Sequence, residues 1–339
     1  MSAVTAGVPT LSLVVPMYNE EETVPIFYRR AVAALEQTAV PFEIVFVDDG
    51  STDATFERLR VLAQGDARIK VVRFSRNFGH QTAVTAGLHY ARGAAVAVID
   101  GDLQDPPEFV PRLFEKWCEG FDVVYAVRRT RKENVLKRAA YRLFYRLLRR
   151  LSYIDIPLDS GDFAIMDRRV VDELNAMPER NRFVRGIRAW VGFRQVGLEY
   201  DREPRFAGES KYPLSKLIKL AYDGLISYSF VPLRMVTHLG FLISVVAFAA
   251  VVYLLTLRVV YGEHLITGWT STVVIVLFLG GIQLLSLGIL GEYVGRIFDE
   301  VKRRPLYVVK ETLGFDTATE MALRGSVETQ VGPRPAMRL

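Results

Sequence analysis

Residues 94–108 read AAVAVIDGDLQDPPE, an apolar run followed at once by two carboxylates with one glycine between them. The run predicts a buried strand over residues 94–99. Because side chains alternate along a strand, we expect Asp100 and Asp102 to point the same way. Two like charges held together require a cation or a shared proton. Since Mg²⁺ and Mn²⁺ are commonly shared between carboxylates and substrate phosphates, the stretch predicts a metal–diphosphate site. A solvated Asp-Gly turn is the alternative.

Apolar strands alternate with amphipathic helices before this stretch. Strands are expected at residues 11–16, 42–47, 69–74 and 94–99, and helices at residues 21–38, about 51–63 and 79–92. Ser51 or Thr52 is the expected N-cap of the second helix. The alternation predicts an α/β fold with a mostly parallel sheet and helices on both faces. Ligands bind such sheets outside the carboxyl ends of the strands, where Asp48, Asp49 and the 100–102 motif all fall.

Two long segments, residues 239–257 and 270–291, contain no charged residue. Each would form about 29–33 Å of helix, enough to cross the hydrocarbon core of a membrane. Basic residues lie before the first segment (Arg234) and after the second (Arg296 and residues 302–304). This bias predicts a multi-pass cell-membrane protein with two spans, whose catalytic domain and both termini are cytosolic. Residues 1–10 lack the features of a signal peptide.

The expected organisation has four parts. Residues 1–210 form a cytosolic catalytic domain, 211–234 an interfacial amphipathic segment, 235–298 two transmembrane helices, and 299–339 a cytosolic, partly disordered tail that loses helical periodicity after Pro305.

The single cysteine, Cys118, limits the possible cross-links and metal sites, and the net charge of +5 limits the possible partners. One cysteine excludes an intramolecular disulfide and a cysteine metal cluster. The charge fits an anionic membrane surface, and no aromatic-basic motif indicates nucleic acid. Residues 128–150 are rich in arginine and aromatic side chains, which predicts a surface for lipid headgroups or phosphate, or else a solvated face.

Four motifs each follow an expected strand: PMYNEE at residues 16–21, VDDGSTD at 47–53, RNFG at 76–79 and DGDLQ at 100–104. In this order they resemble the family 2 glycosyltransferases of the GT-A fold, over about residues 11–232. A narrower resemblance rests on DLQDPPE at residues 102–108, GESKY at 208–212 and the two apolar segments. It points to the polyprenyl-phosphate glycosyltransferases, which include dolichyl-phosphate mannose synthases and bactoprenol glucosyltransferases.

The resemblance implies a set of site residues. The implied nucleotide-sugar-binding residues are Pro16, Tyr18, Glu20, Asp48, Asp49, Asp100, Gly101 and Asp102. Mg²⁺ or Mn²⁺ would be held by Asp100, Asp102 and Gln104, and the implied catalytic residues are Asp100, Asp102 and Asp162. The lipid phosphate would be bound by Arg128, Arg131, Arg205, Ser210 and Lys211, with the alignment within residues 128–142 ambiguous.

Several of these residues have ordinary alternatives. Tyr18 could pack in the core, and Asp162 could be a turn or cap residue instead of orienting sugar hydroxyls or assisting as a base. His80 and His238 are expected to be structural, because no His/carboxylate spacing indicates a zinc site. The GEYVG stretch at residues 291–295 either supports a homo-oligomer or pairs the two spans.

The resemblance implies an inverting enzyme that moves a hexose from a nucleotide sugar to a polyprenyl phosphate, with UDP-glucose the first choice and GDP-mannose the second. A phosphate monoester is largely dianionic at neutral pH, so it is already a nucleophile and has less need of a general base. Two alternatives remain. A processive polysaccharide synthase would need more membrane helices and a Gln-x-x-Arg-Trp motif, and a non-catalytic membrane scaffold would not need Asp100 and Asp102.

Overall fold

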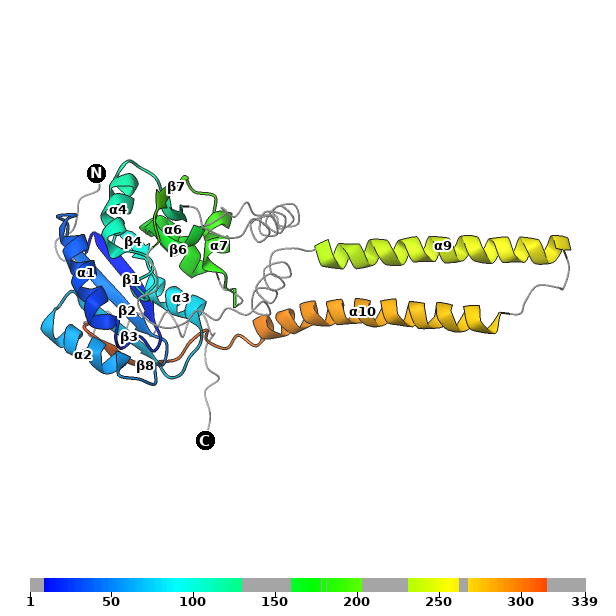
Figure 1. The fold of residues 1–339 in the computed structure, drawn as a ribbon, viewed down its shortest axis with the longest axis horizontal. Coiled ribbons are helices and arrows are strands. Elements are labelled where there is room, and N and C mark those ends of the chain that lie inside the picture. The colour runs from blue at the N-terminus through cyan, green and yellow to red at the C-terminus, as the bar shows by residue number, and fades with distance from the viewer. Residues whose placement is uncertain are drawn as a thin grey trace, which may run out of the picture. The chain divides into compact units, whose positions relative to one another are not determined.

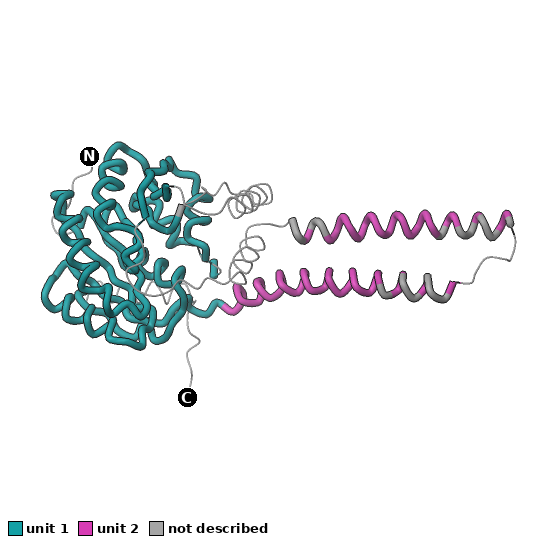
Figure 2. Tube along the Cα trace, viewed as in Figure 1, with its two compact units in different colours: residues 1–146, 154–211, 303–339 teal, residues 147–153, 212–302 magenta. Residues whose placement is uncertain are grey.

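The structure is a computed structural model that describes residues 9–129, 160–177, 179–180, 182–202, 231–261 and 268–315. The chain divides into two compact units (Figure 2). Unit 1 contains residues 1–146, 154–211 and 303–339, and unit 2 contains residues 147–153 and 212–302. The predicted interfacial segment falls almost wholly outside the described residues, as do residues 262–267 and 316–339.

Unit 1 is built around an eight-stranded sheet with the order β7-β5-β6-β4-β1-β2-β3-β8 (Figure 1). The strands are β1 (Leu11–Met17), β2 (Phe42–Asp48), β3 (Ile69–Phe74), β4 (Ala95–Val98), β5 (Val123–Arg128), β6 (Ser160–Asp167), β7 (Gln195–Tyr200) and β8 (Val309–Leu313). Strand β1 pairs in parallel with β2 and β4, β2 with β3, and β5 with β7. Only β6 and β8 run antiparallel to their neighbours. The predicted α/β fold with a mostly parallel sheet is confirmed.

Helices cover both faces of this sheet, as the alternation predicts. They are α1 (Val24–Glu36), α2 (Thr55–Gly65), α3 (His80–Tyr90), the 3₁₀ turn η1 (Pro107–Phe109), α4 (Val110–Cys118), α6 (Arg168–Ala176) and α7 (Val184–Trp190). Along β1 the side chains alternate between two buried clusters: Leu13 packs with the α1, α2 and α4 side, and Val14 with the α3, α6 and α7 side. Burial on both faces explains why the central strands read as continuous apolar runs.

Two local predictions around the site are wrong. Strand β4 ends at Val98, so Asp100 and Asp102 lie in a turn, and strand alternation does not set their direction. Helix α2 begins at Thr55, and Ala54 occupies its N-cap without a side-chain cap. Ser51 and Thr52 lie upstream of this N-cap, and the Ser51 hydroxyl instead accepts the Asn19 N–H at 3.0 Å. Both errors place an element boundary too close to a polar motif.

The sequence predicted a loss of helical periodicity after Pro305, and the described part of the tail contains a strand that this prediction did not include. Strand β8 pairs with β3, with Val71 opposite Leu313 and Phe74 opposite Val309. The free edge of β3 supplies the hydrogen-bonding partner, which the sequence of the tail does not reveal. The chain therefore returns to the sheet of unit 1 after the helices of unit 2.

Unit 2 contains two long helices, α9 (Val231–Tyr261) and α10 (Trp269–Val301), which lie side by side (Figure 1). Many of their large apolar side chains are exposed, as for Phe248 and Leu284. Within the described residues, one stretch is long and apolar enough to cross a membrane, Phe278–Val301, while the apolar stretch of α9 is shorter, Val236–Ala250. One predicted span thus has support, and the second is not confirmed by length and composition.

Candidate active site

The turn that follows β4 is packed tightly against the end of β1. A Cβ at Gly101 would lie 2.3 Å from the sulfur of Met17, which shows how closely the turn approaches the end of β1. Leu103 is buried and has a φ of 60°, an uncommon backbone conformation for a leucine. The Asp102 carboxylate accepts a hydrogen bond of 3.1 Å from the backbone N–H of Gln104, which closes the turn. Asp100, Asp102 and Gln104 are therefore held together, by a turn instead of by a strand face.

His80, at the start of α3, joins two of the predicted acidic residues. Its Nε2 atom lies 3.2 Å from Oδ2 of Asp162 and 3.5 Å from Oδ1 of Asp100. Asp162, on β6, also accepts a 2.7 Å hydrogen bond from the amide of Gln81 and lies 3.4 Å from Nε of Arg185. Asp162 is almost fully buried, whereas the His80 side chain is 44% exposed. Strands β4 and β6 are neighbours in the sheet, which brings Asp100 and Asp162 to one site.

The three titratable groups of this cluster, Asp100, His80 and Asp162, have pKa values that are shifted in different directions. Burial raises the pKa of Asp100 to about 6. Burial lowers the pKa of His80, but the hydrogen bond to Asp162 and the charge of Asp100 outweigh it and raise the pKa to about 9. Burial would raise the pKa of Asp162, yet His80 and Arg185 hold it below its ordinary value. Asp162 is therefore an ionised, weakly basic carboxylate, which favours its orienting role over its role as a base.

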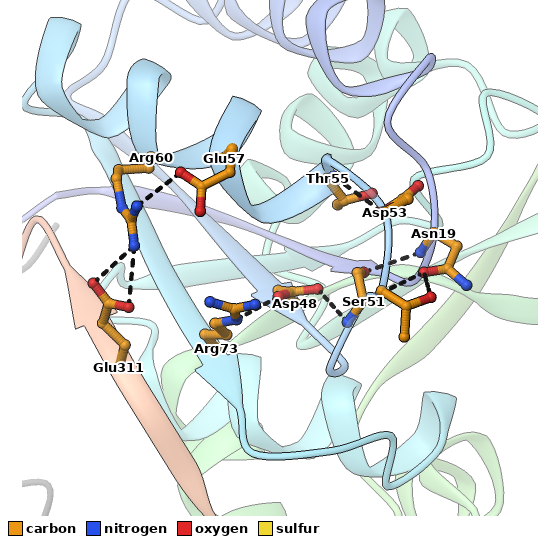
Figure 3. A network of polar contacts seen from close by, with 10 residues as sticks. Asn19, Asp48, Ser51, Asp53, Thr55, Glu57, Arg60, Arg73 and Glu311 are labelled. Atoms are coloured by element: carbon orange, nitrogen blue, oxygen red, sulfur yellow. Dashed lines mark hydrogen bonds and ion pairs between the residues drawn. The ribbon is translucent and has the colours of Figure 1, made fainter.

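Asp48 and Asp49 lie at the end of β2 and are both buried (Figure 3 shows Asp48). Oδ1 of Asp48 accepts the Ser51 N–H at 3.0 Å, and Oδ2 lies 3.4 Å from Nε of Arg73. Asp49 accepts backbone hydrogen bonds of 2.7 Å from Phe78 and 2.9 Å from Gly79. Burial raises the pKa of both carboxyl groups. The two aspartates thus hold the loops of this edge in place, and Asp49 retains acceptor capacity because each carboxylate oxygen can take two donors.

The segment after β1 is tied to the same loop (Figure 3). Asn19 has a φ of 53°, and its side-chain oxygen accepts the Thr52 N–H at 2.9 Å while its own N–H donates to Ser51 Oγ at 3.0 Å. This brings the predicted nucleotide-binding segment, with Pro16, Tyr18 and Glu20, to the edge that carries Asp48 and Asp49. The Tyr18 side chain is 46% exposed, so it is not a core residue.

Arg128, one of the predicted lipid-phosphate residues, belongs to a second charged cluster. Its Nε donates to the Tyr200 hydroxyl at 3.2 Å, and its guanidinium lies 3.8 Å from the buried carboxylate of Asp105. The Tyr200 hydroxyl donates to Asp105, which also pairs with Nε of Arg202 at 3.2 Å. Gly161, next to Asp162, lies against this cluster, since a Cβ there would be 3.1 Å from the Arg128 guanidinium. The remaining predicted lipid-phosphate residues, Arg131, Arg205, Ser210 and Lys211, lie outside the described residues.

The fit of a divalent cation rests on the 100–104 turn. Within the described residues, no group of three or more His, Cys, Asp and Glu side chains is arranged to hold a metal ion. Oδ1 of Asp100 is buried and lies 3.5 Å from His80 Nε2, but it accepts no hydrogen bond in the part of the chain that the structure describes. A carboxylate oxygen of this kind suits a cation that also takes oxygen ligands from a substrate diphosphate. The turn therefore fits a metal ion that takes some of its ligands from a substrate diphosphate. It does not fit a site in which the protein supplies every ligand.

Sequence reasoning did not assign several residues of these clusters to the site. His80 was expected to be structural, and the structure shows that it contacts both Asp100 and Asp162, while Gln81 and Arg185 support Asp162. The only available signal was the position of His80 and Gln81 directly after the RNFG motif. Asp105 stood inside the quoted DLQDPPE motif, but nothing in the sequence paired it with Tyr200.

Comparisons with known proteins found one matching family and several similar proteins. Among solved structures, the fold is similar to glucosyl-3-phosphoglycerate synthase from Mycobacterium tuberculosis in complex with uridine diphosphate, with a TM-score of 0.44, 24% identity and coverage of 65% of this chain and 79% of that chain. Residues 12–174 match the family described as Glycosyl transferase family 2.

Two relatives match over most of their length. The chain is 49% identical over 306 residues to YkcC, an uncharacterized glycosyltransferase of Bacillus subtilis (strain 168), covering 90% of this chain and 94% of that protein. It is 43% identical over 301 residues to the prophage bactoprenol glucosyl transferase homolog of Escherichia coli (strain K12), covering 88% and 98%. From the extent and identity of these sequence matches, the chain belongs to glycosyl transferase family 2.

Proposed function

We propose that this enzyme transfers a hexose from a nucleotide sugar to a polyprenyl phosphate at the cytosolic face of a membrane, with inversion at the anomeric carbon. Glucose from UDP-glucose is the favoured donor sugar, and mannose from GDP-mannose is the second choice. The observation that carries the proposal is the gathering of Asp49, Asp100 and Asp162 at one edge of the sheet, with His80 bridging the last two. The relatives named bactoprenol glucosyl transferase support glucose and a polyprenyl acceptor.

The reaction needs little acid–base chemistry. An oxygen of the lipid phosphate dianion attacks the anomeric carbon and forms the new C–O bond while the bond to the nucleoside diphosphate breaks. The electron pair leaves with the diphosphate, and no proton has to be removed from the nucleophile. The enzyme's task is therefore to hold two anionic substrates close together and to stabilise the charge that develops on the leaving group.

The residues of the site suit these two tasks. Asp100 and Asp102, with Gln104, would hold Mg²⁺ or Mn²⁺, which supplies Lewis-acid stabilisation of the leaving diphosphate. Asp49 and the exposed ring of Tyr18 would bind the nucleoside. Asp162, ionised and held by Gln81 and Arg185, would orient sugar hydroxyls by accepting hydrogen bonds. Arg128, with the basic residues beyond the described part of the chain, would neutralise the lipid phosphate.

The C-terminal strand supports a membrane hairpin that crosses twice. Strand β3 precedes helices α9 and α10 in the chain, and β8 follows them, yet β3 and β8 pair in one sheet. A single sheet lies on one side of a membrane, so the chain between these strands must cross an even number of times. If α10 crosses, α9 is the candidate for the second crossing among the described helices. The basic residues that flank the helices favour the cytosolic side for the sheet.

Cysteine labelling tests this topology. A membrane-impermeant maleimide should label a cysteine placed at His264 in intact cells, in a background that carries Cys118→Ser. The exposed native Cys118, on α4, is the matched control and should react only after lysis. A cysteine at position 264 that reacts only after lysis contradicts two complete spans.

The activity itself is tested with the purified full chain in lipid nanodiscs containing undecaprenyl phosphate. UDP-glucose, GDP-mannose and other radiolabelled nucleotide sugars are supplied with Mn²⁺ or with EDTA, and the organic phase is extracted. We expect a single lipid-linked hexose, formed most rapidly from UDP-glucose and lost with EDTA. A product that grows into polymer would favour a polysaccharide synthase, and the absence of any transfer from the whole donor panel would favour a scaffold.

A further inference from the structure

Residues 303–315 dock on unit 1 at the strand edge next to β3 (Figure 1). Beyond the β8 ladder, the backbone N–H of Ser75 donates to the Val308 carbonyl at 2.9 Å. Tyr307 comes just before β8 and is 7% exposed, although it lies only six residues after the last residue of α10, Val301. A segment that follows the hairpin therefore buries an aromatic side chain in the catalytic unit.

Tyr307 contacts the end of β3 through its ring. It stacks on Phe74, with ring centroids 4.9 Å apart and planes 18° apart. Phe74 in turn meets Phe78 edge to face, at 5.7 Å and 88°. Aromatic pairs in these arrangements have preferred geometry, so the position of one ring constrains the next. The three rings connect the C-terminal segment to the loop that joins β3 to α3.

This loop supports Asp49. The backbone N–H groups of Phe78 and Gly79 donate to the two oxygens of Asp49 at 2.7 and 2.9 Å. The loop also packs against the turn after β2, since a Cβ at Gly50 would lie 2.3 Å from the carbonyl carbon of Arg76. A displacement of Phe78 would therefore move the carboxylate that Asp49 offers to a ligand.

We infer that Tyr307 is a positioning residue of the donor site, acting through Phe74 and Phe78 on Asp49. The inference deepens the proposed function and rests on it, because it takes Asp49 as part of the nucleotide-sugar site. The donor site is then complete only when the segment after the membrane helices has returned to the sheet. Tyr307 should affect the nucleotide sugar and not the polyprenyl phosphate.

The test compares Tyr307→Ala, Tyr307→Leu and Tyr307→Phe in the full-length enzyme. Tyr307→Ala removes the stacked ring, Tyr307→Leu keeps apolar volume without the ring in case the alanine variant does not fold, and Tyr307→Phe keeps the ring. We expect Tyr307→Ala and Tyr307→Leu to raise the Kd for UDP and the KM for the nucleotide sugar roughly tenfold, as when one charge-assisted hydrogen bond is misaligned. The KM for polyprenyl phosphate should stay unchanged, and Tyr307→Phe should restore donor affinity.

Phe315→Ala is the matched control. Phe315 belongs to the same docked segment, but it packs edge to face on Tyr90 at the far end of α3, with centroids 5.2 Å apart. It should lower the melting temperature while leaving the Kd for UDP unchanged. Equal weakening of UDP binding by Phe315→Ala and Tyr307→Ala, or unchanged binding in Tyr307→Ala and Tyr307→Leu, overturns the inference. A wild-type enzyme that binds neither UDP nor GDP would instead overturn the proposed function.

Discussion

The pair Asp48 and Asp49 lies at the end of β2, and the pair Asp100 and Asp102 follows β4 at the same edge of the sheet. The surroundings of the two pairs differ. Asp48 and Asp49 are at most 3% exposed, and backbone N–H groups and Arg73 occupy their oxygens. Asp100 and Asp102 lie in a turn beyond β4, and the Asp100 side chain is 32% exposed and contacts His80. Asp48 mainly holds the loops of the site, and Asp49 holds a loop while keeping acceptor capacity for a ligand. The Asp100 side chain, by contrast, is partly open to solvent. Similar acidic motifs can therefore differ in how far their oxygens are already used by the fold.

The largest expected effect comes from the second pair. Asp102→Asn keeps the shape of the side chain but removes the charge that would help to hold a cation and the diphosphate. We expect transfer to fall by roughly a hundredfold or more, since Lewis-acid stabilisation contributes several kcal/mol. The melting temperature should change little. Initial rates of lipid-linked sugar formation measure the effect.

Glu108→Gln is the control for this variant. Glu108 lies in the same acidic stretch but forms a surface ion pair with Arg30 at 2.7 Å. Surface pairs contribute about 0–1 kcal/mol, so this variant should keep its activity. Near-normal turnover of Asp102→Asn at ordinary Mg²⁺ or Mn²⁺ would contradict the assigned role.

The sequence predicted much of this fold but only part of the site. The strand at residues 69–74 was predicted with its observed bounds, because a run bounded by polar residues and buried on both faces leaves a clear pattern. The bridge from Asp100 through His80 to Asp162 could not be predicted, because His80 lies 20 positions from Asp100 and 82 from Asp162, which is on an antiparallel strand. Strand β8 was missed for a related reason, since its partner lies more than two hundred residues earlier.

Two glycine substitutions, one beside each pair of aspartates, compare the two regions by their effect on protein stability. Gly50, beside the first pair, has a φ of 69°, and an added Cβ would meet the backbone of Arg76. We expect Gly50→Ala to destabilise the protein by about 1–3 kcal/mol, or several degrees in melting temperature. Gly101→Ala would meet the flexible side chain of Met17 instead, so its effect on stability should be smaller. Thermal melts of both variants test this order, and a larger loss for Gly101→Ala would contradict it.

The smallest expected effect is on the pH dependence of protein stability, and it comes from Asp48 of the first pair. Burial raises the pKa of Asp48 above its value in the unfolded chain. Between these two pKa values the folded protein holds a proton that the unfolded chain has lost, so the stability contributed by this group falls as the pH rises. Asp48→Asn cannot titrate. The stability difference between the wild type and this variant should therefore shrink from about pH 4 to pH 7. A difference that widens with pH would mean that the ion pair with Arg73 outweighs burial.

Calorimetric titration of UDP into the purified enzyme, with and without Mn²⁺, tests the central claim most directly. The wild type, Asp102→Asn and Asp48→Asn are compared under the same conditions. The account predicts that Mn²⁺ strengthens UDP binding in the wild type and in Asp48→Asn, and that this gain is lost in Asp102→Asn. Loss of the Mn²⁺ effect in Asp48→Asn with its retention in Asp102→Asn would show that the roles of the two pairs have been assigned the wrong way round.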